Sequence, residues 1–307
     1  MKHRKVLLLG ACLLLVSVMT TSAWAYTQSL PSVNLGLTSF LDGGPPAGPG
    51  FYYTGYLQYY TADELVDHPL IPDTDVDVWL YLNQFIYQSD TPVFLGGKWG
   101  INVMVPIVGF DTDPDIDNGT GVGDVLVGPL LQWDPIMGPN GPKFMHRVEL
   151  QMLFPVGKYD EDEPINPGSN FFSFNPYWSG TYFFTPQLTA STRVHYLWNE
   201  KNDEPLSVLG LDDTQAGEAI HANFTVAYEF IPKKLRAGLN GYYLKQISDT
   251  EADGTEISGR EQVLGIGPGL LWSFSQDSHL FFNAYFETSV KNRPEGERMI
   301  LRYVHHF

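Results

Sequence analysis

Two histidines and a serine are the residues of this sequence best suited by type to catalysis. Ser191 and His195 stand four residues apart in one segment of alternating polarity, and His221 stands in the next such segment. A hydroxyl activated by a neighbouring histidine is the nucleophile of many hydrolases. The sequence holds neither a G-x-S-x-G nor an H-E-x-x-H string, the common contexts for hydrolytic chemistry. We therefore expect that the protein is not an enzyme, and hydrolysis at His195 or His221 stays an alternative.

An acidic run, residues 111–117, could bind a cation. Its aspartates alternate along the chain, a spacing at which carboxylates can converge on Ca²⁺. Asn118 stands where the loop of an EF-hand requires glycine, and Pro114 lies within the run. We therefore expect a solvated acidic loop, whose carboxylates divalent ions can bridge to lipopolysaccharide phosphates, and the sequence implies no cofactor or specific metal site.

A larger set of polar side chains lies on the polar faces of segments in which polar and apolar residues alternate. The candidates for a solute pathway are Asp124, Arg147, Glu149, Arg193, His195, His221, Glu229, Arg236, Asn240, Tyr242 and Gln246, with Gln151, Asn223, Glu287, Arg298 and Arg302 on the same faces. In lipid such groups must be hydrated or paired, so we expect them inside a closed barrel. Most would pair with one another, while arginines and glutamates on opposed walls would select solutes by charge.

Twelve segments of alternating polarity must position these residues. They cover residues 50–61, 74–88, 97–109, 120–134, 144–157, 171–184, 186–199, 217–230, 233–247, 260–274, 278–290 and 296–307. Strands of soluble sandwiches are usually about 5–6 residues long, whereas a tilted strand that crosses a bilayer needs about 9–11 residues. The lengths and the apolar outer faces predict a transmembrane barrel.

The connections between the twelve segments differ at the two ends of this barrel. Odd-numbered connections are mostly long and rich in Asp and Glu, as in the stretch from Asp160 to Glu163. Even-numbered connections are mostly short, such as Thr185-Pro186 and Ile231-Pro232. Long extracellular loops and short periplasmic turns are typical of outer-membrane barrels, and an even strand number places both ends of the barrel in the periplasm.

The first 25 residues read as a secretory signal peptide. Basic residues precede an apolar run, and Ala23-Trp24-Ala25 offers a cleavage site. Cys12, the sole cysteine, would instead belong to a lipoprotein signal, an alternative that the long apolar run beyond it disfavours. Residues 26–49 lack a long alternating strand, so they are expected to form either a periplasmic linker or a plug folded into the lumen.

The C-terminus and the charge of the chain restrict its partners. Phe307 ends an alternating series, as in the signal read by the outer-membrane assembly machinery, although His305 departs from the usual aromatic residue. The formal net charge of −17 disfavours binding to a phosphate backbone, so nucleic acid is excluded as a partner. Outer-membrane lipid, lipopolysaccharide, the assembly machinery and a small-molecule solute are the partners that we expect.

Several motifs resemble a known family. They are Gly50-Phe51-Tyr52-Tyr53, Thr120-Gly121-Val122-Gly123-Asp124-Val125-Leu126-Val127-Gly128-Pro129, Phe172-Ser173-Phe174-Asn175-Pro176-Tyr177, Leu239-Asn240-Gly241-Tyr242-Tyr243-Leu244-Lys245-Gln246-Ile247 and Leu264-Gly265-Ile266-Gly267-Pro268-Gly269-Leu270. This combination resembles the bacterial outer-membrane family labelled after the meta-pathway of phenol degradation, over roughly residues 50–307. The resemblance implies a barrel that takes up aromatic or other hydrophobic compounds, and it brings no catalytic residues.

The sequence as a whole predicts an all-β protein in the outer membrane of a Gram-negative bacterium. Residues 1–25 would be a signal peptide, residues 26–49 a periplasmic segment or lumen plug, and residues 50–307 a single 12-stranded antiparallel barrel. The expected function is a channel or transporter for small solutes, with hydrophobic or aromatic compounds preferred. A structural or adhesive barrel with a plugged lumen, and a barrel hydrolase, are the two alternatives.

Overall fold

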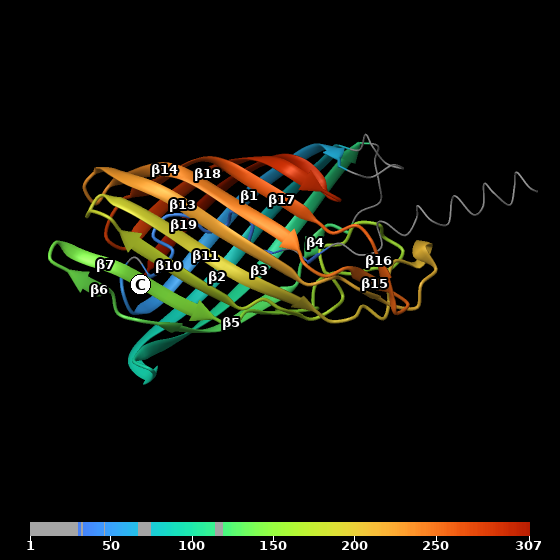
Figure 1. The fold of residues 1–307 in the computed structure, drawn as a ribbon, viewed down its shortest axis with the longest axis horizontal. Coiled ribbons are helices and arrows are strands. Elements are labelled where there is room, and N and C mark those ends of the chain that lie inside the picture. Colours follow the sequence, from blue (N-terminus) through green and yellow to red (C-terminus); the bar gives the residue numbers. More distant parts are fainter. Residues whose placement is uncertain (1–29, 32, 46, 67–74, 114–118) are drawn as a thin grey trace, which may run out of the picture.

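The computed structural model describes residues 30–31, 33–45, 47–66, 75–113 and 119–307. The predicted leader and residues 114–117 of the acidic run lie outside the described residues. Among the residues described, no helix is both long and apolar enough to cross a membrane. The described chain is built almost wholly from antiparallel strands, which run side by side along the long axis of the molecule (Figure 1).

Twelve antiparallel strands, three of them divided into two pieces, close into one barrel, which confirms the predicted fold class. The barrel closes because β1 pairs with β19, from Tyr52 opposite His306 to Ala62 opposite Gly296. In chain order the strands are β1 Gly50–Leu65, β2 Asp75–Phe94, β3 Gly97–Asp113, β4 Gly121–Val122 with β5 Val125–Gln132, β7 Gly141–Glu149 with β8 Met152–Phe154, β9 Ser173–Phe174 with β10 Tyr177–Phe183, β11 Leu188–Asn199, β13 Ala219–Ile231, β14 Leu235–Gln246, β17 Gln262–Ser273, β18 Ser278–Lys291 and β19 Pro294–His306. Each overlaps a predicted segment, and β2 is the strand that extends furthest beyond its predicted limit.

The side chains of these strands alternate between lipid and lumen because successive residues of a strand point to opposite faces. On β11, Val194 and Tyr196 are exposed on the outer face, whereas Arg193, His195 and Leu197 are buried on the inner face. The same alternation runs through β13, β14 and β18. The outer surface of the barrel therefore carries most of the exposed large apolar side chains, as a barrel embedded in lipid requires.

The two ends of the barrel differ as predicted, with one exception. One end, called the loop end, carries the long connections, which include the short strands β12 Thr214–Gln215, β15 Thr250–Ala252 and β16 Thr255–Ile257, joined in a small sheet. The other end, called the turn end, carries the C-terminus and the short turns (Figure 1). The exception is the connection between β18 and β19, which lies at the loop end and has only two residues, Asn292 and Arg293.

Two hairpins at the turn end extend further than the sequence predicts. Strand β2 continues to Phe94, beyond the predicted limit at residue 88, and an extra strand, β6 Ile136–Gly138, pairs with β7. The two hairpins are tied together because Trp133 donates from Nε1 to the carbonyl of Leu95, at 3.0 Å. Pro92 interrupts the alternation of polar and apolar residues beyond residue 88, so the predicted strand ended there and not at Phe94.

Candidate functional site in the barrel lumen

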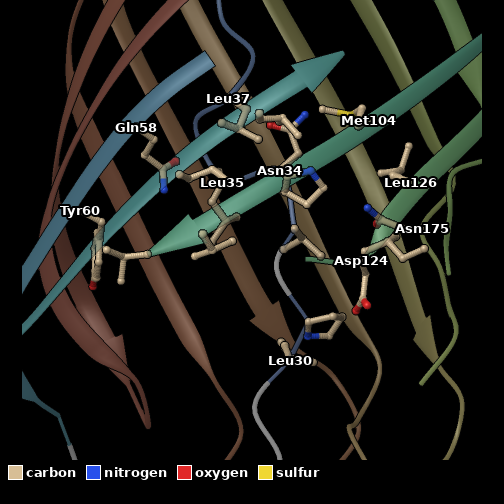
Figure 2. Close-up of a pocket in the computed structure, with 18 of the residues that line it drawn as sticks. Leu30, Asn34, Leu35, Leu37, Gln58, Tyr60, Met104, Asp124, Leu126 and Asn175 are labelled. Atoms are coloured by element: carbon tan, nitrogen blue, oxygen red, sulfur yellow. The ribbon is translucent and has the colours of Figure 1, made fainter. Parts of the chain in front are cut away.

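The lumen is occupied by the N-terminal segment, described from residue 30 to residue 45 and called the lumen segment below. Its residues Leu35, Leu37 and Phe40 are buried, and Figure 2 shows Leu30, Asn34, Leu35 and Leu37 between the barrel strands. At the loop end the amide of Leu30 donates to Glu261 Oε1 at 3.0 Å. The segment then runs the length of the barrel and continues to Gly50, where β1 begins at the turn end.

The barrel wall holds the lumen segment mainly through its backbone. Asn223 Oδ1 accepts from the amide of Gly36 at 2.7 Å, and Thr181 Oγ1 accepts from the amide of Gly43 at 2.9 Å. Arg298 and Arg302 donate to the carbonyls of Leu35 and Leu37, at 3.1 and 3.3 Å. Because these bonds involve backbone groups that carry no side-chain information, the sequence pattern gave no sign of this path.

One ion pair joins the lumen segment to the wall through side chains. Arg193 on β11 donates from Nε and Nη2 to the two carboxylate oxygens of Asp42, at 2.7 and 2.6 Å. The guanidinium also lies 3.9 Å above the ring of Tyr177. Paired hydrogen bonds of this kind are among the strongest that charged side chains make, so Asp42 is the principal polar anchor of the lumen segment.

A buried carboxylate organises the wall beside this pair. Glu149, on β7, accepts from Tyr177 Oη at 2.7 Å, from Asn102 Nδ2 at 2.8 Å and from Gln151 Nε2 at 2.9 Å. Gly128 on β5 is required here, because a Cβ at that position would collide with the Glu149 carboxylate. This contact explains in physical terms one glycine of the motif that resembles the family.

A second carboxylate network lies closer to the loop end. Glu287 on β18 accepts from Tyr60 Oη at 2.9 Å and from Tyr242 Oη at 2.6 Å, and Arg298 Nη2 lies 3.7 Å away. The Tyr242 ring fills the space over Gly265 on β17, where a Cβ would collide with it. Sequence reasoning placed Tyr242 on the inner face but had no means of finding Glu287 as its partner.

The remaining predicted site residues also lie on the inner side, each with a local partner. Glu229 pairs with Arg236 across β13 and β14 at 2.9 Å, near the turn end. Asn240 donates to Asn283 Oδ1 at 2.6 Å, and Gln246 donates to Thr250 Oγ1 at 3.0 Å. The partners of Asn240 and Gln246 were not among the predicted candidates.

Asp124 has a different setting from the other candidates, because it holds a loop. Its carboxylate accepts from the amide of Gly157 at 3.0 Å and from the amide of Ser169 at 2.7 Å. These amides belong to the connection between β8 and β9, which Asp124 thereby ties to the barrel wall. Asp124 lies where β4 and β5 separate, and its side chain also borders a cavity (Figure 2).

The two histidines of the hydrolase alternative face each other rather than a serine. His195 and His221 are cross-strand partners, and their rings stack with centroids 4.1 Å apart. His221 Nε2 and Asn175 Oδ1 are 2.9 Å apart. Ser191 hydrogen-bonds with Thr181 at 2.9 Å, four residues along the strand from His195, which at about 3.3 Å per residue is some 13 Å. The described geometry thus does not bring Ser191 to either ring.

Among the described residues, cavities lie beside the lumen segment toward both ends of the barrel. The loop-end chamber has a volume of about 380 Å³, and the turn-end chamber has a volume of about 630 Å³. Thr38, Tyr56, Gln84 and Arg193 border both chambers. The middle of the lumen segment, near Thr38, therefore lies at the level that separates the two chambers.

The loop-end chamber has polar lining residues, such as Gln58, Gln84 and Gln151. One side of its wall is nevertheless apolar, contrary to the expectation of a polar inner face. It is formed by Val78, Leu80, Leu82, Met104, Val108, Phe110, Leu126 and Leu153 on β2, β3, β5 and β8. A signal was present in the sequence, because residues 78–82 and 103–108 are runs without a polar residue. Such a run indicates a strand whose two faces both meet apolar surroundings.

The turn-end chamber is rich in positive charge. Arg193 and Arg236 have carboxylate partners there, in Asp42 and Glu229. Arg147 donates to Gln132 Oε1 at 2.9 Å, and Arg302 stacks 3.7 Å over the ring of Phe281. Within the described ranges neither of these two arginines forms a salt bridge.

Charged groups outside the membrane-spanning strands pair locally. Arg260 donates to both carboxylate oxygens of Asp249, each at 2.8 Å, and these hydrogen bonds hold the pKa of Asp249 below its usual value.

In the part of the chain that is described, no three His, Cys, Asp or Glu side chains are grouped to hold a metal ion. Asp111 and Asp113 end β3, and the other two aspartates of the acidic run lie outside the described residues.

Comparisons with known proteins found one matching family model and several similar barrel structures. The family model described as "Putative MetA-pathway of phenol degradation" matches residues 49–303. An outer membrane channel from Pseudomonas putida F1 is 15% identical, with a TM-score of 0.72 over 91% of this chain and 100% of that one. The β domain of the Bordetella autotransporter BrkA is 11% identical, with a TM-score of 0.47 over 85% of this chain and 100% of that one. No curated protein matches the sequence. At 15% identity the likeness to the Pseudomonas protein concerns the fold.

Proposed function

The chain belongs to the MetA-pathway family of phenol degradation, and from that premise we propose that it is an outer-membrane channel for small hydrophobic or aromatic solutes. A closed antiparallel barrel with an apolar outer surface is the form in which proteins cross the bacterial outer membrane. The observation that carries the proposal is the pair of chambers in the lumen, which together border the lumen segment from one end of the barrel to the other. The Pseudomonas protein of the same fold is itself described as an outer membrane channel.

Passage in this proposal depends on the lumen segment. A solute enters the loop-end chamber, passes the level of Thr38 when the lumen segment shifts, and leaves through the turn-end chamber. The eleven predicted inner residues would act in two ways. Arg147 and Arg193 would set the charge of the pathway, whereas Glu149, His195, His221 and most of the others would keep the wall rigid through their mutual contacts.

Two further proposals concern partners and catalysis. The exposed Phe307 follows the last strand and lies near Phe51, with ring centroids 5.7 Å apart. In this position it would be open to the assembly machinery before the barrel enters the membrane.

We also propose that the protein is not an enzyme. That proposal is supported by the separation of Ser191 from His195 along β11.

The test is the single-channel conductance of the refolded protein in a planar bilayer, with and without residues 26–49. Silence that truncation relieves supports a channel closed by the lumen segment. A steady current in the full-length protein means an open aqueous pore, and the proposed gating then fails. Silence in both forms favours a lateral route or the structural alternative, a barrel without a transport function.

Solute class needs a second measurement in whole cells, because aromatic compounds cross plain phospholipid bilayers but are slowed by lipopolysaccharide. Gram-negative cells that produce the protein should accumulate a radiolabelled monocyclic aromatic compound several times faster than cells that lack it. Equal rates in the two strains would contradict the assignment to aromatic solutes.

A further inference from the structure

We propose that the loop-end chamber is a binding site for a single uncharged aromatic molecule, with the lumen segment as one of its walls. This inference rests on the proposed function, because it specifies where a solute of that class would be held on its way through the barrel. Three observations carry it: the volume of the chamber, the chemistry of its walls and the balance of its charges.

The volume of the chamber matches a small ligand. Its 380 Å³ compares with about 150 Å³ for an engineered apolar cavity that holds benzene, and with about 300–1,000 Å³ for small-molecule pockets in general. A molecule of one or two aromatic rings fits this space.

The walls of the chamber are apolar on two opposite sides. Leu82 and Met104 are buried on the barrel side. Leu35 and Leu37 are buried on the side of the lumen segment, and they pack into the same cluster as Leu82 and Met104. Figure 2 shows Leu35, Leu37 and Met104 at the chamber. An aqueous pore has no use for such a lining, because apolar side chains gain stability only when water is removed from them. Leu80, which borders the chamber and is only half-buried, would lose contact with water when an apolar ligand binds.

The loop-end chamber and the turn-end chamber differ in how their charged groups are paired. The charged groups that border the loop-end chamber all have partners. Arg193 pairs with Asp42, Arg293 with Glu261 at 3.3 Å, Arg298 with Glu287 at 3.7 Å, and Asp124 accepts from two backbone amides. Because each of these charges has a partner among the described residues, the chamber offers an anion little to offset the cost of its desolvation. The turn-end chamber, by contrast, contains the guanidinium groups of Arg147 and Arg302, which form no salt bridge among the described residues.

The proposed ligand site in the loop-end chamber depends on the lumen segment, because that segment supplies part of its lining. Leu30, Val33, Leu35 and Leu37 line the chamber from the segment, and the amide of Leu30 is fixed by Glu261 at the loop end. The ligand site therefore exists only while the lumen segment is in place. Movement of the segment would open the chamber and release the ligand in one step.

The experiment is a binding measurement by ¹⁹F nuclear magnetic resonance on the full mature chain in lipid nanodiscs. The probe is 4-fluorotoluene, with 4-fluorobenzoate as the charged analogue and empty nanodiscs as the correction for partition into lipid. A protein-dependent shift and broadening of the 4-fluorotoluene resonance is expected, displaced by unlabelled toluene. The loop-end site is overturned by the absence of any effect beyond that of empty nanodiscs, or by equal competition from 4-fluorobenzoate.

Matched variants locate the site. Leu82→Asn places an amide in the wall of the loop-end chamber, and it should weaken binding of 4-fluorotoluene at least tenfold. Leu271→Asn makes the same change at a buried inward leucine that borders the turn-end chamber, and it should leave binding unchanged. Equal losses in the two variants would refute the site. Met104→Gln, which keeps the size of the side chain, gives the same comparison if Leu82→Asn does not refold.

The binding measurement and the uptake measurement test the site and the proposed function separately. Binding of 4-fluorotoluene without uptake in cells would retain the site and remove the proposed function. Uptake without saturable binding would retain the function and remove the site.

Discussion

Asp42 and Arg193, which are 151 residues apart in the chain, make two parallel hydrogen bonds across the lumen, at 2.6 and 2.7 Å. Their side chains are 10% and 7% exposed. This pair is the point at which a segment without secondary structure is fixed to a rigid wall. It makes the position of the lumen segment sensitive to a single side chain.

The first prediction concerns this pair. Asp42→Asn leaves the buried guanidinium without a charged partner, a loss that costs about 3–5 kcal/mol in comparable buried pairs. The lumen segment should detach more often, and the frequency of channel openings in a planar bilayer should rise at least about tenfold, since each 1.4 kcal/mol corresponds to a factor of ten. Asp134→Asn, which removes the exposed partner of Lys98, is the control and should leave the openings unchanged. Identical openings in both variants would contradict the anchoring role of Asp42.

The second prediction concerns charge selectivity. Arg147→Ala removes a positive charge without a carboxylate partner from the turn-end chamber, and Arg193→Ala leaves Asp42 unpaired. Both variants should shift the reversal potential toward cation selectivity, most clearly at low salt, where screening is weak. Lys143→Ala changes the net charge equally but lies at an exposed position of β7, so it should have no effect. Unchanged potentials in both arginine variants would remove these residues from the pathway.

The third prediction concerns the space for Tyr242. Gly265→Ala adds a methyl group where the Tyr242 ring lies, and overpacking of this kind costs about 1–3 kcal/mol. The midpoint of urea unfolding, followed by heat-modifiable gel mobility, should fall. Gly109→Ala, on a strand position whose nearest contact for a Cβ is Thr120 at 3.7 Å, should leave the midpoint unchanged. A lower midpoint for Gly109→Ala than for Gly265→Ala would contradict the steric argument.

The fourth prediction concerns the loop that Asp124 holds. Asp124→Asn weakens the acceptor for the amides of Gly157 and Ser169. Cleavage by trypsin after Lys158 in intact cells should become several times faster. Asp90→Asn, at an exposed position of the turn end, serves as the comparison and should not alter cleavage. Equal cleavage in the two variants and the wild type would show that Asp124 does not restrain this loop.

The twelve strands and the family could be predicted from the sequence because both depend on local information. The alternation of apolar and polar residues has a period of two, so it identifies a strand and the face of each residue without any knowledge of its neighbours. The long connections, the short turns and the motifs around Asp124 and Asn240 are also contiguous in the chain. The same rule placed Arg193, His195, Tyr242 and Gln246 on the inner face, and that these residues line a pathway for solute stays a prediction.

The contents of the lumen were decided by the tertiary structure alone. Residues 30–45 have no period, and their path is set by hydrogen bonds and an ion pair to strands that lie more than 80 residues away, such as those of Gly36 with Asn223 and of Asp42 with Arg193. The apolar side of the loop-end chamber arises because inward residues of β2, β3, β5 and β8 meet across the curvature of a closed sheet. The sequence by itself thus determined the barrel and the direction of its side chains, because these follow from local periodicity. Closure of the barrel decided which of those side chains meet, since that depends on the register of all twelve strands at once.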